Sequence, residues 1–192
     1  MNEKILLVSA SKKSGEALEQ LLRRYSWTNI DLVYDGSDAR RSILQVDYDI
    51  MIVNMPLKDE QGHGLALDII QSTSLSVIAI VKAESYGLLA SKLEPAGVLV
   101  CPKPFQQSDF LSAVRLAAAF RNRLKKYESE NRKLQKKYEE QRVVSRAKCL
   151  LVEFEKMSEP EAHRYIEKMA MDKRSTKLEI SNRLIALYKD DD

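Results

Sequence analysis

Short apolar runs alternate with amphipathic stretches through the first 120 residues of the chain. Five runs have the length and continuous apolar character of buried parallel strands: Lys4–Val8, Asp31–Tyr34, Ile50–Val53, Val77–Val81 and Val98–Cys101. Helical spacing follows each of them, in Gly15–Tyr25, Ser37–Gln45, Gly64–Gln71, Tyr86–Leu93 and Gln106–Phe120. This alternation predicts a doubly wound α/β domain with a five-stranded parallel sheet, whose functional crevice lies at the carboxyl ends of the strands.

A long helix is predicted from Phe110 to about Lys156, because this stretch contains neither glycine nor proline. Seam residues recur at alternating spacings of three and four, which is a heptad pattern typical of a coiled coil. The predicted dimer seam consists of Phe120, Leu124, Tyr127, Asn131, Leu134 and Tyr138. A single seam asparagine favours a parallel homodimer, although the seam could instead pack within the chain.

Beyond residue 140 the pattern predicts three short helical pieces that form a small all-α domain. Ser158–Glu161 and Thr176–Glu179 are capping boxes, which open the second and third pieces. The inward residues are expected to be Val144, Ala147, Leu151 and Phe154, then Ala162, Tyr165, Ile166, Met169 and Ala170, then Leu178, Leu184, Ile185 and Tyr188. We therefore expect three parts, at residues 1–120, 121–140 and 141–192.

Charge divides the chain in a way that the net value of +3 hides. Residues 1–110 carry a net charge of −3 and residues 111–192 a net charge of +6. A basic second half favours a polyanionic partner, although a solvated helix surface would look the same. The two cysteines lie far apart without metal-ligand spacing, and no leader or membrane span is evident, so we expect a cytoplasmic protein.

Two segments of the first half resemble response-regulator receiver domains. Asp49–Pro56, followed by Gly62, is similar to their third strand and loop, and Val98–Phe105 is similar to their fifth strand with its Lys-Pro-Phe ending. The resemblance covers residues 3 to about 120. It implies a phosphate-accepting aspartate after the third strand, two metal-binding acids after the first and a hydroxyl after the fourth.

This sequence departs from the receiver pattern at a degenerate phosphoacceptor site, which consists of Ser9, Ala10, Asn54, Val81 and Lys103. Asn54 replaces the aspartate, and an amide cannot form an acyl phosphate. Ser9 and Ala10 replace the acids that would help to bind Mg²⁺. Val81 replaces the hydroxyl, unless the alignment slips by one residue. Lys103 alone remains, either bonded to Asn54 or solvated, and a cis bond is expected before Pro104.

The second half resembles the ANTAR domain of transcription antiterminators. The matching residues are Arg146–Leu151, Ser158–Ile166 and Met169–Arg174, and Cys149 stands where the family often has glycine. The resemblance implies binding to hairpins in nascent mRNA leaders. Candidate RNA-binding residues are Arg146, Lys148, His163, Arg164, Lys168, Lys173, Arg174 and Lys177. Tyr165 is expected in the core rather than stacked on a base.

The function predicted from these observations is an RNA-binding antiterminator dimer that is controlled without phosphorylation, with a regulatory protein as a possible further partner. No cofactor, metal or catalytic residue is expected, because the sequence has no phosphate-binding glycine loop, catalytic triad or paired acids. Two alternatives stay open at this stage. One is a DNA-binding response regulator, and the other is an interaction scaffold without nucleic-acid affinity.

Overall fold

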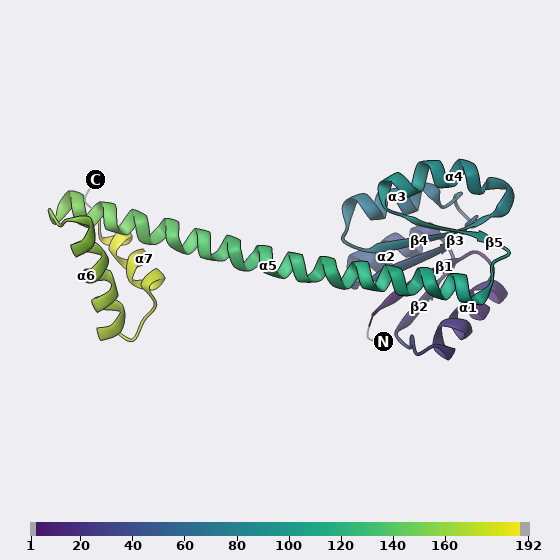
Figure 1. Ribbon diagram of the computed structural model, residues 1–192, viewed down its shortest axis with the longest axis horizontal. Helices are drawn as coiled ribbons and strands as arrows, with labels where there is room; N and C mark the ends of the chain where they lie inside the picture. Colours follow the sequence, from purple (N-terminus) through teal and green to yellow (C-terminus); the bar gives the residue numbers. More distant parts are fainter. Residues whose placement is uncertain (1–2, 189–192) are drawn as a thin grey trace. The chain divides into compact units, whose positions relative to one another are not determined.

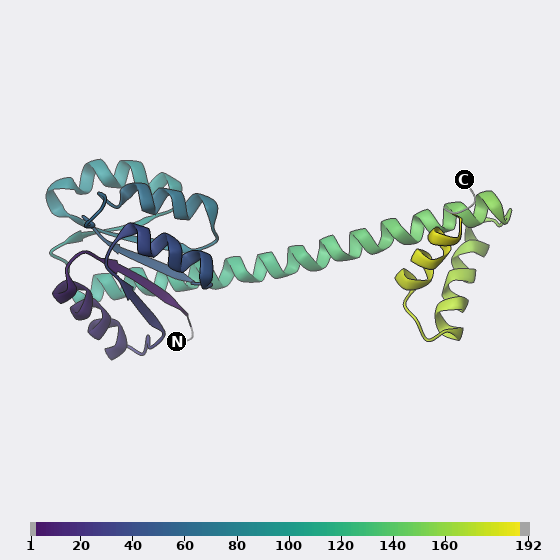
Figure 2. The same cartoon turned by 180° about the vertical axis from the view of Figure 1, so that it is seen from behind.

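The computed structural model describes residues 3–188 and divides between Lys126 and Tyr127 into two compact units (Figures 1 and 2). One helix, α5 (Gln107–Phe154), runs through this division. The predicted boundaries at residues 120 and 140 both fall inside α5 and stay predictions. No helix within the described range is long and apolar enough to cross a membrane.

The first unit is built on a five-stranded parallel sheet, which confirms the predicted fold class. Its strands are β1 (Ile5–Ser9), β2 (Ile30–Val33), β3 (Ile50–Asn54), β4 (Ser76–Lys82) and β5 (Leu99–Lys103), in the order β2-β1-β3-β4-β5. The strand order changes direction between β1 and β3, because β2 lies on one side of β1 and the later strands lie on the other. Ser9 and Asn54 lie in register there, at the carboxyl ends of the two strands. This is the position at which doubly wound sheets form their crevice.

Helices cover both faces of the sheet and bury a separate apolar layer on each (Figure 1). Helices α2 (Gly36–Gln45), α3 (His63–Ser72) and α4 (Tyr86–Leu93) bury Ala39, Leu65 and Leu93 on one face. Helix α1 (Lys12–Arg24) and the beginning of α5 bury Leu22, Phe110 and Val114 on the other. Two 3₁₀ turns, Ala83–Ser85 and Glu94–Ala96, flank α4. The strands are apolar on both faces, as their sequences predict.

The second unit packs α6 (Glu159–Asp172) and α7 (Lys177–Leu187) against the last part of α5. Both predicted capping boxes are present, at Ser158 with Glu161 and at Thr176 with Glu179. Helix α5 ends at Phe154, and Lys156 takes a left-handed conformation with φ 55°. The core consists of Ala147, Leu151, Ala162, Ile166, Ala170, Ile180 and Leu184.

Three residues expected in the core of this unit are not buried: Phe154, which is 49% exposed, Tyr165 and Leu178. Tyr165 is 37% exposed, because it lies on the edge of α6 next to the buried Ile166. Ile180 and Ser181 are buried in α7, whereas Leu178 is only half-buried. The buried face of α7 therefore begins two residues later than the apolar spacing from Leu178 suggests.

The buried carboxylate of Asp49, directly before β3, links the sheet to Arg121 and Lys125 of α5. It accepts a hydrogen bond from the backbone N–H of Lys4 at 3.1 Å and lies 3.5 Å from Arg121 and 2.5 Å from Lys125. Burial by itself would raise the pKa of Asp49. Lys125, the Lys4 backbone and Arg121 outweigh this effect and hold the pKa below its usual value.

Substituting Asp49→Asn should lower the free energy of unfolding of the first unit by about 1–3 kcal/mol at pH 7, since charge-assisted hydrogen bonds are lost. A carboxylate with a depressed folded-state pKa stabilises above its unfolded pKa of about 3.9, and this stabilisation disappears as pH falls through the folded value. The acid-side loss of stability should therefore be shallower in the variant. Urea unfolding between pH 7 and pH 3 measures both effects, and Asp47→Asn, at an exposed neighbour, should change neither.

Candidate nucleic-acid interface and receiver crevice

A chain of hydrogen bonds joins the carboxyl ends of three strands in the first unit. Lys103 Nζ donates to Asn54 Oδ1 at 2.9 Å and to the backbone carbonyl of Met55 at 2.6 Å. Asn54 Nδ2 donates to Ser9 Oγ at 3.0 Å, and Ser9 Oγ in turn donates to the Ser11 carbonyl at 3.2 Å. Of the two expectations for Lys103, contact with Asn54 is therefore the one that the structure shows. The bond before Pro104 is cis, as expected.

The strand register identifies a different residue from the one expected at the end of β4. Val81 is fully buried in the core, whereas the next residue, Lys82, is exposed and pairs in register with Lys103. A lysine rather than a valine therefore borders the crevice at the end of β4. Burial lowers the pKa of Lys103, and the nearby charge of Lys82 lowers it further.

The side chains gathered at these strand ends are an amide, a hydroxyl and two amines. An amide and a hydroxyl can exchange hydrogen bonds with Lys103, but they supply neither a carboxylate nucleophile nor anionic metal ligands. Ala10, which follows β1, contributes only a methyl group and is half-buried. The arrangement suits a structural link or non-covalent binding better than phosphoryl transfer.

In the second unit the eight predicted RNA-binding residues fall into two sets. Five have exposed side chains that are available to an anionic ligand: Arg146, Arg164, Lys168, Lys173 and Arg174. The other three are held by glutamates. Lys148, expected on the outside, is 19% exposed and lies 2.8 Å from Glu159, while His163 and Lys177 both contact Glu167.

Arg164 and Lys168 lie one turn apart on α6 and share an open depression of about 500 Å³ with Tyr165 and Lys156. We call these four residues the α6 patch. The lining combines the exposed Tyr165 ring with cationic side chains, and Glu155 and Glu161 also border it. An aromatic ring with nearby cations is the combination that stacks on unpaired bases while neutralising phosphates. Sequence reasoning left Tyr165 out of the candidate set, because helical spacing assigned this residue to the core.

A larger groove of about 1250 Å³ lies between the last part of α5 and the amino end of α7. Lys136, Lys137 and Tyr138 line it together with the glutamate-bound Lys148, His163 and Lys177. Charge alone leaves open whether the basic residues of α5 contact a polyanion or only form a solvated helix surface. Their position in a groove with three of the predicted residues adds them to the candidate interface.

Comparison with known proteins agrees with this architecture. The sequence model of the ANTAR domain matches residues 132–185. The chain is 32% identical over 162 residues to the transcriptional regulatory protein PdtaR of Mycobacterium tuberculosis, in two strains, and the match covers 83% of this chain and 78% of PdtaR.

Solved structures resemble the first unit at identities that establish the fold alone. The signal receiver domain of a putative Luxo repressor protein from Vibrio parahaemolyticus has a TM-score of 0.60 at 23% identity, and the match covers 67% of this chain and 98% of that one. A structure described as adenylate cyclase from Rhodopirellula baltica has a TM-score of 0.61 at 19% identity, covering 69% and 99%. With a receiver fold in the first unit and an ANTAR domain in the second, the chain belongs to the family of ANTAR-domain transcriptional regulators that includes PdtaR.

Proposed function

We propose that this protein is an RNA-binding transcription antiterminator, which binds hairpins in nascent mRNA leaders in the cytoplasm. The observation that carries the proposal is the α6 patch, in which Arg164 and Lys168 line one depression with the exposed ring of Tyr165 inside the ANTAR match. Loops of RNA hairpins expose unstacked bases, and basic and aromatic side chains recognise them together. Binding would hold the leader in its antiterminator form, so that polymerase reads through.

Each candidate residue has a role that follows from its surroundings. Arg146, Arg164, Lys168, Lys173 and Arg174 contact phosphates, since their side chains are exposed. Tyr165 stacks on a base. Lys148, His163 and Lys177 act differently, because Glu159 and Glu167 already hold them. These pairs fix the positions of the side chains, and an incoming phosphate competes with the glutamates for them.

The working form in this proposal is a parallel homodimer. The seam residues Phe120, Leu124, Leu134 and Tyr138 are 54%, 42%, 65% and 66% exposed. Large apolar side chains repeated at heptad spacing on an exposed helix are best covered by a second copy of the same helix. Asn131, also exposed, lies in the middle of this stripe, where a seam asparagine sets the register.

Phosphorylation does not control this protein in our proposal, because Asn54 replaces the nucleophile and Ser9 and Ala10 replace the acids. Control then passes to a regulatory protein, to a ligand of the crevice or to the abundance of the protein. The first unit acts as a pseudo-receiver, which keeps the receiver fold for binding rather than for phosphoryl transfer.

A DNA-binding response regulator is the second candidate, and α7 argues against it. A recognition helix needs several side chains that reach base edges in the major groove. The basic residues of α7 are Lys177 and Arg183, and Lys177 forms an ion pair with Glu167. An interaction scaffold, the third candidate, would give no salt-dependent affinity for nucleic acid.

The double substitution Arg164→Ala and Lys173→Ala should weaken binding to a two-hairpin leader RNA by about tenfold or more. It should also lower the salt slope by about two, one for each lost phosphate contact. Titrations at several salt concentrations, with a duplex DNA of equal length for comparison, measure both quantities. Lys12→Ala with Lys13→Ala, which removes the same charge from exposed positions of α1, is the control and should change neither. Equal affinity for RNA and DNA would contradict the proposal.

The substitution Leu134→Glu should raise the dimer dissociation constant at least about tenfold, because two like charges would meet in the seam. Analytical ultracentrifugation of the full chain measures this constant. Leu44→Glu is the matched control, since Leu44 is 87% exposed on α2 and lies outside the seam. A wild-type monomer, or equal effects of the two substitutions, would speak against the coiled-coil dimer.

Purified protein incubated with Mg²⁺ and a small-molecule phosphodonor should gain no phosphoryl mass, because the Asn54 amide cannot accept a phosphoryl group to form an acyl phosphate. Intact-protein mass spectrometry reads the result. The substitution Asn54→Asp alone should not restore phosphorylation, since Ser9 and Ala10 still provide no acid for the metal. Stable, stoichiometric phosphate on the wild-type chain would overturn the pseudo-receiver assignment.

A further inference from the structure

The receiver crevice has become positively charged. The expected acidic positions are neutral at Ser9, Ala10 and Asn54, while Lys82 and Lys103 lie side by side in register on β4 and β5. Both hydrogen-bond partners of Lys103 in the described chain, Asn54 Oδ1 and the Met55 carbonyl, are uncharged oxygen atoms. A half-buried ammonium with only neutral partners is stabilised by an anion, should one enter.

The carboxylates of the neighbouring loop are engaged elsewhere. Asp59 accepts hydrogen bonds from the backbone N–H groups of Gly36 at 2.9 Å and Ser37 at 3.0 Å, at the amino end of α2. Glu60 binds Arg40. Glu84, an acid that lines the pocket beside Lys82, lies 3.5 Å from Lys82, and the two side chains are 75% and 58% exposed. Such an exposed pair is weak, so that a better-placed anion can displace Glu84.

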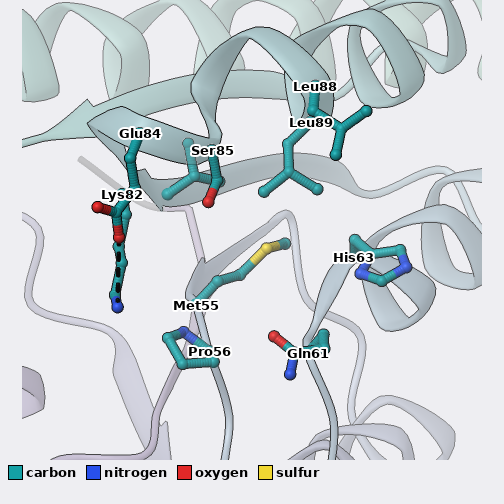
Figure 3. A pocket seen from close by; sticks show the side chains of 10 residues that line it. Met55, Pro56, Gln61, His63, Lys82, Glu84, Ser85, Leu88 and Leu89 are labelled. Atoms are coloured by element: carbon teal, nitrogen blue, oxygen red, sulfur yellow. Dashed lines mark ion pairs between the residues drawn. The ribbon is translucent and has the colours of Figure 1, made fainter.

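A pocket of about 270 Å³ opens directly beside Lys82 (Figure 3). Met55 and Leu89 provide apolar walls, Ser85 points toward the space between them, and His63 and Gln61 lie at the opposite side from Lys82. Met55 connects the pocket to the two lysines, because its side chain lines the pocket and its carbonyl binds Lys103. A cavity of about 150 Å³ already holds benzene, so this one has room for a body of about one ring.

We propose that this pocket binds a small organic carboxylate without covalent chemistry. The carboxylate lies at Lys82 and Lys103, replacing Glu84 as the partner of Lys82 and giving Lys103 an anionic neighbour. The apolar body of the ligand lies against Met55, Leu88 and Leu89, and Ser85 or Gln61 hydrogen-bonds any polar substituent. This site is independent of RNA binding and provides the first unit with a chemical signal in place of phosphate.

The test uses the full-length ¹⁵N-labelled chain with three probes: sodium benzoate, benzamide and sodium phosphate. Benzoate should shift the amide signals of Ser85 and His63 saturably. Benzamide, which lacks the charge, and phosphate, which lacks the apolar body, should each bind at least about tenfold more weakly than benzoate. Benzoate that causes no saturable shift, or phosphate that binds as tightly as benzoate, would overturn the proposal.

Two substitutions at exposed positions separate the head of the ligand from its body. Lys82→Met should weaken benzoate binding by about tenfold, and Leu88→Ser should weaken benzoate while leaving phosphate unchanged. The control is Lys92→Met, the same exchange at an exposed position of α4 outside the pocket. Equal benzoate affinity in the Lys82 variant and the Lys92 control would contradict the assigned site.

Discussion

Helix α5 contributes buried side chains to both hydrophobic cores, and each unit depends on this burial. Phe110, Val114 and Ala117 pack under the sheet of the first unit, and Ala147 and Leu151 pack against α6 and α7 in the second. The second unit spans residues 127–192, and α6 and α7 without α5 would form little core. Its fold therefore needs the end of α5 as a third helix.

Between these two buried segments, the apolar residues of α5 keep their heptad spacing but remain exposed. The buried residues of α5 end at Ala118 in the first unit and begin again at Ala147 in the second. In the intervening stretch, the spacing has no function within either core, whereas a second copy of the helix would use it directly. The same helix can thus provide core for each unit and a pairing surface between chains.

The first unit shows that the stability and the chemistry of a receiver fold depend on different residues. The sheet is stabilised by continuous apolar strands such as Ile5–Val8, which are fully buried. Phosphoryl transfer needs carboxylates at strand ends, where side chains contribute little to the core. The strand ends of this unit carry Ser9, Ala10 and Asn54 instead of carboxylates, and hydrogen bonds among Lys103, Asn54 and Ser9 satisfy polar groups there.

Most of the architecture could be predicted from the sequence, since strand burial, helix spacing and the two capping boxes are local patterns. The errors arose where orientation depends on tertiary packing. Spacing along the helix places Tyr165 in the core and leaves Ile180 out of it. In the structure Tyr165 is exposed and Ile180 is buried. The strand register placed Lys82, rather than Val81, beside Lys103.

Ion pairs between residues on either side of a turn could not be predicted from the sequence for a related reason. Lys148 and Glu159, or Lys177 and Glu167, meet only after the helices have packed. The pocket beside Lys82 likewise combines residues from β3, α3, β4 and α4, which no sequence spacing brings together.

The most direct test of the central claim is read-through in a purified transcription system, on a template with a two-hairpin leader followed by a terminator. We expect the unmodified full chain, with no phosphodonor present, to increase the fraction of full-length transcripts, and the Arg164→Ala and Lys173→Ala variant to lose this effect. Read-through that requires a phosphodonor, or that is unchanged by the protein, would contradict an antiterminator that acts through RNA binding without phosphorylation.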